Sequence, residues 1–249
     1  MIVTRHVTKY FGDSPAVKDV SFEIHPGEIV GFLGQNGAGK TTLMRILTSY
    51  LPASSGSVFI DGEDISGHSL SIRKKIGYLP ETPPLYTNMT VKDYLKFAAE
   101  IKDVPLKQRR NRLDKVLEEC QLVDVQGKTI VTLSKGYKQR VGIAQAIIHE
   151  PKILILDEPT IGLDPIQILQ VRSLIQNLRN ERTVLLSTHI LSEIEQIAQR
   201  VLIIRSGQII VDGSLEELLK APGTARSGGS TLEEFFVSCH QKQTEAHGE

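Results

Sequence analysis

One eight-residue segment constrains this chain more than any other. Gly34-Gln-Asn-Gly-Ala-Gly-Lys-Thr41 fits the pattern G-x-x-x-x-G-K-[ST], and it lies between an apolar run at 29–33, typical of a strand, and a helix-like segment at 42–47. Glycines let the backbone turn tightly enough for several amide N–H groups to point at phosphate oxygens, and the helix N-terminus adds partial positive charge. The sequence therefore predicts a phosphate-binding loop between a strand and a helix.

The residues of this loop, called here the phosphate loop (residues 34–41), have distinct expected roles. Lys40 reaches the β- and γ-phosphates of a nucleotide, and the hydroxyl of Thr41 ligates Mg²⁺. The remaining positions expected to contact the nucleotide here are Gly34, Asn36, Gly37, Ala38, Gly39 and Thr42.

A pair of carboxylates, Asp157 and Glu158, ends the apolar run at 152–156. Such a run is typical of a parallel strand buried on both faces, and ligands of open parallel sheets bind at the carboxyl ends of strands. We expect Asp157 to lie beside the phosphate loop and Mg²⁺, and Glu158 to polarise a water for attack on the γ-phosphate. The chain has no Asn-Lys-x-Asp segment, which a GTPase would use to read its base, so ATP is the expected nucleotide.

A polar turn, Leu133-Ser-Lys-Gly-Tyr137, opens a long amphipathic segment at 138–148 and forms a second helix N-terminus able to bind an anion. With this turn a few residues before the Asp-Glu strand, the chain resembles the ATP-binding cassette (ABC) family, whose signature is Leu-Ser-Gly-Gly-Gln. The resemblance runs from about residue 11 to about residue 213. It implies an α/β fold: a P-loop NTPase core with a mainly parallel sheet, an antiparallel β subdomain and a helical lobe that carries the signature.

The resemblance also implies a site shared between two chains. Ser134 and Gly136 would contact the γ-phosphate of ATP held by the other subunit, and Asp164 matches the loop that crosses the dimer seam. Two residues depart from the family signature: Lys135 replaces the first glycine and Tyr137 the glutamine. Lys135 either adds positive charge near the phosphates or faces solvent. A second cassette, identical or different, is therefore an expected partner.

Four further positions take expected roles from the same resemblance. His189, which follows the apolar run at 184–186, matches the histidine that touches the γ-phosphate and the attacking water. Phe11 occupies the aromatic position that stacks on adenine, with Tyr10 as the second choice, and Val17 joins the expected cofactor-binding residues.

Glu81 departs from the family pattern, which has a glutamine at this position. A carboxylate still ligates Mg²⁺, but an ionised carboxylate accepts hydrogen bonds without donating any. The prolines of Glu81-Thr-Pro-Pro-Leu-Tyr86 hold the segment exposed and stiff. Leu85 and Tyr86 either anchor separate membrane subunits in the cleft between the lobes or pack internally.

The chain divides into two expected parts. Residues 1–213 form the cassette, with a helical lobe at about 82–148 inserted in the core, and residues 214–249 form a C-terminal extension. Within this extension, 221–230 has the composition of a flexible linker, and a capping box of Thr231 and Glu234 begins a short helix.

Composition and charge exclude several classes of protein. With 29 basic and 29 acidic residues and a pI near 7.1, the chain lacks the electrostatic footprint of a nucleic-acid-binding protein. Its two cysteines, Cys120 and Cys239, have no metal-ligand spacing. No apolar run reaches the roughly 18 residues that cross a bilayer, and residues 1–6 lack the apolar core of a signal peptide. We expect a cytoplasmic protein, peripheral on the cell membrane.

These features together predict the nucleotide-binding subunit of an ABC transporter. It would be a Mg²⁺-dependent ATPase that hydrolyses ATP in a dimer and drives export through integral membrane transporter subunits. Pro80-Glu81, the Lys-Gly signature and Leu232-Glu-Glu-Phe-Phe236 are similar to cassettes of two-component exporters for gliding motility, drug and sodium extrusion. The alternative is a soluble ABC protein that acts as a nucleotide-dependent scaffold or regulator without transport.

Overall fold

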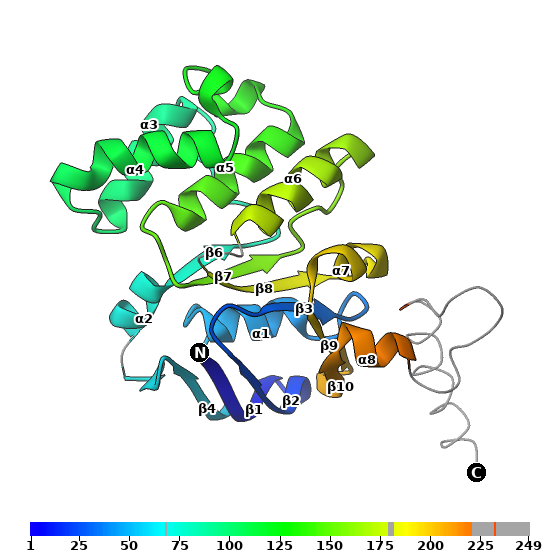
Figure 1. Cartoon of the computed structure of the whole chain (residues 1–249). Helices are drawn as coiled ribbons and strands as arrows, with labels where there is room; N and C mark the ends of the chain where they lie inside the picture. The colour runs from blue at the N-terminus through cyan, green and yellow to red at the C-terminus, as the bar shows by residue number, and fades with distance from the viewer. Residues whose placement is uncertain (68, 179–181, 221–231, 233–249) are drawn as a thin grey trace, which may run out of the picture.

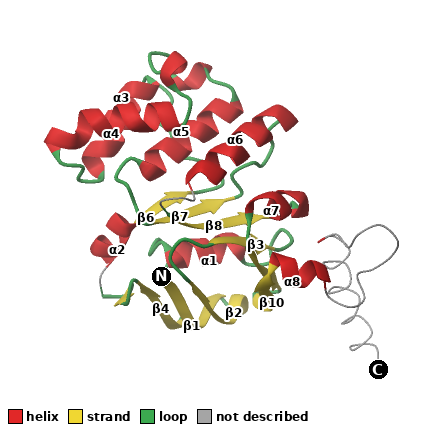
Figure 2. Ribbon diagram, viewed as in Figure 1, coloured by secondary structure: helices red, strands yellow, loops and turns green. Residues whose placement is uncertain are grey.

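The computed structural model describes residues 1–67, 69–178, 182–220 and 232. Figures 1 and 2 show three regions: a group of helices that includes α3, α4 and α5, a central sheet below it, and a smaller sheet at the opposite end from the helices. In the described part of the chain, no helix has the length and apolar character needed to span a membrane.

The central sheet has six strands in the order β10-β9-β3-β8-β7-β6. Their bounds are β3 (Ile29–Leu33), β6 (Ile76–Leu79), β7 (Ile153–Asp157), β8 (Thr183–Thr188), β9 (Arg200–Arg205) and β10 (Gln208–Ser214). All pairs are parallel except β10 with β9. Every residue of β3, β7 and β8 is buried, which explains why the middle of each strand is apolar. Because these strands are parallel, their carboxyl ends meet at one edge of the sheet.

The smaller sheet is antiparallel, with strands β1 (Ile2–Phe11), β2 (Ser14–Ile24), β4 (Ser55–Ile60) and β5 (Glu63–Asp64) in the order β2-β1-β4-β5. Helix α1 (Lys40–Leu47) lies between the two sheets (Figure 1). One hydrophobic core joins all three elements, for example through Ile24 of β2, Phe32 of β3 and Met44 of α1. The phosphate loop is thereby fixed at both of its ends by buried structure.

The helical lobe contains α3 (Val91–Ile101), α4 (Leu106–Glu119) and α5 (Lys135–Ile147), with two short 3-10 turns, Val123–Val125 and Ile130–Thr132, between α4 and α5. Thr90 caps α3, since its Oγ1 accepts a hydrogen bond from the Asp93 backbone N–H at 3.1 Å. Helix α5 is buried along most of its length and contacts β6. The signature residues therefore begin a helix that is embedded in the protein.

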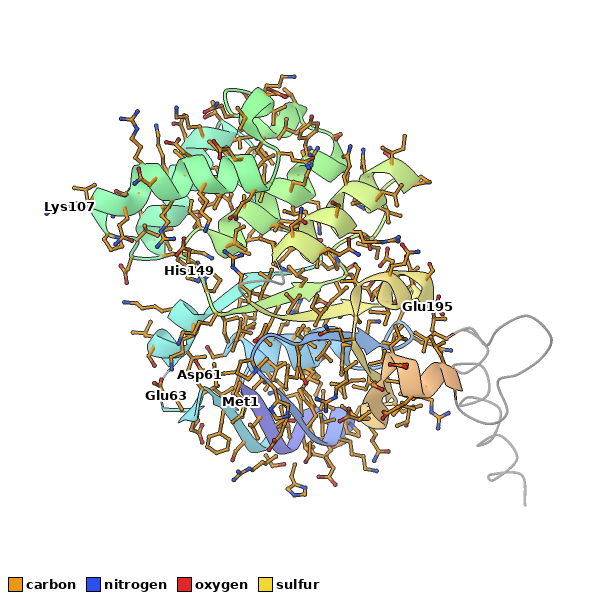
Figure 3. All side chains as sticks on the ribbon, in the orientation of Figure 1. Met1, Asp61, Glu63, Lys107, His149 and Glu195 are labelled. Atoms are coloured by element: carbon orange, nitrogen blue, oxygen red, sulfur yellow. The ribbon has the colours of Figure 1, made fainter. Side chains whose placement is uncertain are left out.

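Four helices complete the described chain: α2 (Ser69–Lys75), α6 (Pro165–Leu178), α7 (Leu191–Ile197) and α8 (Leu215–Lys220). The predicted α/β class, with its mainly parallel sheet, antiparallel subdomain and helical lobe, is confirmed. The proposed linker at 221–230, the capping box of Thr231 and Glu234, and Cys239 lie outside the described residues. Leu232 is described and fully buried, and its backbone N–H donates to Glu195 Oε1 at 2.6 Å; Figure 3 labels Glu195 on α7.

Candidate functional site

A cavity of about 290 Å³ opens at the phosphate loop. Its lining comprises Ala16, Asn36, Gly37, Gly39, Lys40, Thr41, Thr42, Glu81, Glu158 and Ile161. The loop turns through positive φ angles at Gly37 (80°) and Gly39 (107°), a region that favours glycine. A Cβ atom on Gly34 would lie 2.6 Å from the Ile204 carbonyl oxygen, so only glycine fits there as well. The glycines thus permit both the turn and the close packing of the loop.

Lys40 lines this cavity, is buried and makes three polar contacts. Its Nζ donates to the carbonyl oxygens of Gly34 at 2.8 Å and Gln35 at 3.2 Å. The same Nζ lies 3.1 Å from Oε1 of Glu158. The ammonium group therefore connects the phosphate loop to the end of β7.

Glu158 follows β7 directly and adopts a left-handed backbone conformation, with φ of 49°. Its backbone N–H donates to the carbonyl oxygen and to Oγ of Ser187, each at 3.1 Å. Its second carboxylate oxygen, Oε2, lies 2.8 Å from Nδ1 of His189. The carboxylate is thus held between a cationic group and an imidazole, in a position on the cavity wall where it can accept a proton from a water.

Asp157 is completely buried beside this pair. Its Oδ1 accepts a hydrogen bond from Ser187 Oγ at 2.6 Å, while Oδ2 has no hydrogen-bond partner among the described residues. Burial raises the pKa of this carboxyl group, and hydrogen bonds from Ser187 and Thr41 act in the opposite direction. An unpaired buried carboxylate oxygen beside a threonine hydroxyl fits a hard cation such as Mg²⁺.

The sheet edge thus brings together most of the residues predicted for nucleotide and metal. Glu81 is exposed and lines the same cavity as Thr41, so a third oxygen ligand is available to a cation there. Ser187 has no predicted role, yet it contacts both Asp157 and Glu158. The signal that reveals it is register, because Ser187 of β8 lies opposite Asp157 of β7.

Of the residues expected near adenine, two are exposed at the surface and one is buried in the core. Phe11 and Tyr10, at the end of β1, are 55% and 48% exposed, and Lys9 Nζ lies 5.6 Å from the centre of the Phe11 ring. Val17 is fully buried in the core between the sheets and does not line the cavity, whereas its neighbour Ala16 does. Ala16 is a lining residue without a role in the sequence prediction, and the cofactor-binding role of Val17 stays a prediction. The stacking role of Phe11 stays a prediction.

The signature turn (residues 133–137) does not line the cavity of its own chain. Ser134 is exposed and caps α5, because its Oγ accepts from the Tyr137 N–H at 3.4 Å. Gly136 is buried against Gln167 of α6, and Asp164 is exposed at the start of that helix. These three predicted positions thus lie outside the site formed by Lys40 and Glu158.

The phosphate loop and the strand-end carboxylates, held on one edge of a parallel sheet, place this protein among the P-loop nucleoside triphosphatases. The family model described as ABC transporter matches residues 17–161, more than half of the chain. The chain belongs to the ABC transporter family, as an ATP-binding subunit that hydrolyses ATP.

Individual relatives agree with this assignment. The chain is 40% identical over 222 residues to the bacitracin transport ATP-binding protein BcrA of Bacillus licheniformis, covering 88% of this chain and 72% of BcrA. A solved ATP-binding subunit of an ABC transporter is similar with a TM-score of 0.85 and 28% identity, covering 97% of this chain and all of the other. A dimeric cassette, MJ0796, solved in a post-hydrolysis state with ADP and Pi, has a TM-score of 0.78 and 26% identity, covering 86% and 99%.

Proposed function

We propose that this chain pairs with a second cassette, that the two close on ATP and Mg²⁺, and that hydrolysis drives export through separate membrane subunits. The observation that carries the proposal is that the residues expected to act on the nucleotide lie in two separate places within one chain. Lys40, Glu158 and His189 meet at the cavity, while the signature turn lies outside it. The similar cassette MJ0796 is a dimer with hydrolysis products, which supports a site completed by another chain.

In the proposed site the chain's own residues bind phosphate and activate water. Lys40 exchanges its contacts with Gly34, Gln35 and Glu158 for phosphate oxygens, with the loop N–H groups as further donors. Glu158 then accepts a proton from the attacking water, and His189 orients the carboxylate. Phe11 is the proposed stacking partner of adenine. The proposed nucleotide contacts also include Ala16, Val17, Gly34, Asn36, Gly37, Ala38, Gly39 and Thr42.

Thr41, Asp157 and Glu81 would hold Mg²⁺ through oxygen atoms. Bound there, Mg²⁺ would neutralise charge on the phosphate groups during their transfer. The second chain would supply Ser134, Gly136 and Asp164 to the same nucleotide. Among these, Ser134 is the best placed, because it is exposed at the N-terminus of α5, where partial positive charge favours an anion.

We further propose that a membrane subunit docks in a groove between the core and the helical lobe. This groove, about 420 Å³ in volume, is lined by Thr48, Tyr50, Leu70, Arg73, Lys74, Ile76, Tyr78, Ile101, Lys102, Asp103 and His149. Tyr50, Leu70 and Ile101 are 74%, 73% and 65% exposed, so the rim offers apolar surface. Figure 3 labels His149 at the junction between the helical lobe and the sheet. The side chains of Arg73 and Lys74 outnumber the single carboxylate of the lining, Asp103, which favours an occupant with apolar and acidic side chains.

The two residues expected to anchor the membrane subunits, Leu85 and Tyr86, do not line this groove and pack at the helical lobe. Leu85 is partly buried and packs against the main core. Tyr86 is 55% exposed and packs against Tyr94 and Phe97, with ring centroids 6.1 and 5.3 Å away. Internal packing therefore accounts for Leu85, and Tyr86 remains available at the surface.

The direction of transport and the location of the protein rest on similarity. The relative BcrA bears the name of a bacitracin transport protein, which supports export. The resemblance of Pro80-Glu81 and the Lys-Gly signature to two-component exporters points the same way. A cassette that serves membrane subunits would lie on the cytoplasmic face of the membrane. The competing function is a nucleotide-dependent scaffold without transport.

Affinity purification from membranes tests the proposed docking. We expect a polytopic membrane protein to co-purify with the wild-type chain and to be lost with Tyr50→Asp. Val123→Asp is the control, because Val123 is an exposed apolar residue outside the groove. A purified chain that turns over ATP but retains no polytopic protein, or retains it equally with both variants, would favour the scaffold function.

A further inference from the structure

Lys135, one of the two departures from the family signature, reaches from the signature turn to the loop that follows β7. This loop (residues 158–164) is called here the catalytic loop because it begins with Glu158. A methyl group on Gly162 would collide with Nζ of Lys135, so the ammonium lies directly against this glycine. Gly162 has a φ of 66°, which favours glycine. Because glycine has no side chain, the ammonium of Lys135 can occupy the space beside it.

A second contact joins the signature turn to α6, the helix that follows the catalytic loop. A Cβ atom on Gly136 would lie 2.6 Å from Cδ of Gln167, so the side chain of Gln167 covers the signature turn. The Gln167 backbone N–H donates to Asp164 Oδ1 at 2.9 Å, which fixes the end of the catalytic loop to the start of α6. Helices α5 and α6 contact each other, as Figure 1 shows. The signature turn and the catalytic loop are therefore packed together within one chain.

The catalytic loop reaches the chain's own nucleotide cavity at both Glu158 and Ile161. Gly162, the residue under Lys135, is the next residue after Ile161. A shift of the signature turn would thus act on the wall of the cavity and on the residue proposed to activate water.

Helix stability does not account for a lysine at this position. Lys135 is the first residue of α5, where the helix macrodipole disfavours a cation by about 0.3–1 kcal/mol. The side chain is exposed, so burial of its stem adds little to compensate. The contact that the structure does show for this side chain is the packing of its ammonium against Gly162.

We propose that Lys135 is a positioning residue that ties the signature turn to the catalytic loop of the same chain. The proposal rests on the dimer proposed above. In that dimer the signature turn of one chain meets the nucleotide of the other, while Glu158 of the first chain serves its own nucleotide. Lys135 therefore couples occupancy of one site to the geometry of Glu158 in the other.

A mixed dimer with one hydrolytic site tests this role. One copy of the chain keeps Glu158, the other carries Glu158→Gln, and different affinity tags isolate the mixed species. Lys135→Ala is then placed either in the copy that keeps Glu158 or in the other copy. Positioning within one chain predicts a kcat about tenfold lower in the first arrangement only, as expected for small misplacement of a catalytic group. KM for ATP should not change, because the phosphate loop is untouched.

Lys135→Arg in the copy that keeps Glu158 should restore most of the activity, since it retains the charge and the reach. Lys107→Ala is the matched control: Lys107 is an exposed lysine in the first turn of α4, labelled far from the sheet in Figure 3. A loss only when Lys135→Ala is in the Glu158→Gln copy would mean that Lys135 acts on the partner's phosphates, and it would overturn the proposal. Equal losses in both arrangements, or none, would overturn it too. If the parent mixed dimer does not assemble with ATP, the proposed dimer itself fails.

Discussion

Nζ of Lys40 lies 3.1 Å from Oε1 of Glu158, and both side chains are only 6% exposed. The residue expected to bind phosphate and the residue expected to activate water are thus paired with each other. Negatively charged phosphates would compete for Lys40, and Glu158 would keep its contact with His189 at 2.8 Å. Nucleotide binding would therefore release the carboxylate from its ion pair with Lys40.

Breaking this ion pair should lower the stability of the nucleotide-free protein. Lys40→Met leaves a buried carboxylate with one fewer partner, and we expect a loss of about 3 kcal/mol in the free energy of unfolding, measured by urea titration. The double variant Lys40→Met, Glu158→Gln should recover most of that loss, because no buried charge remains uncompensated. Additive losses in the double variant would show that the two side chains do not interact.

The free energy of unfolding should depend on pH through the buried ammonium of Lys102. Burial lowers the pKa of its ammonium from 10.5 to about 7 in the folded protein. Nε2 of His149 contacts the carbonyl oxygen of Ile76 and must donate to it, so Nδ1 accepts from Lys102 at 3.4 Å. Burial and the charge of Lys102 lower the pKa of His149 to about 3, which keeps this imidazole neutral.

Between pH 7 and pH 10 the unfolded chain binds a proton at Lys102 that the folded protein does not bind. The free energy of unfolding should therefore rise with pH across this window, and below pH 7 the burial penalty should be fully present. Urea unfolding at pH 7 and pH 9 measures the effect against Lys102→Met, which should lose this part of the increase. Lys107→Met is the control that should behave as wild type; an unchanged slope in Lys102→Met would contradict the prediction.

Glu81→Gln should retain substantial ATP hydrolysis. Glutamate offers a carboxylate oxygen to Mg²⁺ and glutamine an amide oxygen, and the exposed position of Glu81 makes the change sterically tolerable. Steady-state turnover with MgATP measures the effect. A fall to the level of Glu158→Gln would show that the negative charge of Glu81 is essential to the reaction.

Ser187→Ala should weaken Mg²⁺ binding more than it weakens folding. The hydroxyl donates to Asp157 Oδ1 at 2.6 Å and accepts from the Glu158 N–H, so it orients a proposed metal ligand. We expect the Mg²⁺ concentration for half-maximal turnover to rise about tenfold, typical of losing an outer partner of a ligand. Ser187→Thr, which keeps the hydroxyl, is the control. An unchanged Mg²⁺ requirement would mean that Asp157 does not depend on Ser187.

Much of the nucleotide site could be predicted from the sequence because its signals are local. The phosphate loop and the Asp-Glu pair each follow a buried strand, and parallel pairing brings both to one edge. Contacts that depend on three-dimensional packing could not be predicted. Val17 and Ala16 are neighbours in β2, yet Val17 is buried in the core and Ala16 lines the cavity, a difference that depends on how β2 packs.

Two other contacts could not be predicted from the sequence, because they too depend on how distant segments pack. Lys102 and His149 are far apart in the sequence and meet only where α3 and the end of α5 converge. The contact of Lys135 with Gly162 depends on how α5 and α6 pack. Sequence patterns left open whether Lys135 faces solvent or phosphate; the structure shows an exposed side chain whose ammonium lies on the catalytic loop.

The central claim, a site completed by two chains, is tested most directly by the mass of Glu158→Gln in solution. Light scattering after size exclusion should show a monomer without nucleotide and a dimer with ATP and Mg²⁺, since the variant binds ATP but cannot activate water. Turnover should fall by at least about a hundredfold. Ser134→Arg, which blocks the exposed turn, should prevent the dimer in the Glu158→Gln background. A monomer under all conditions, together with near wild-type turnover, would contradict the account.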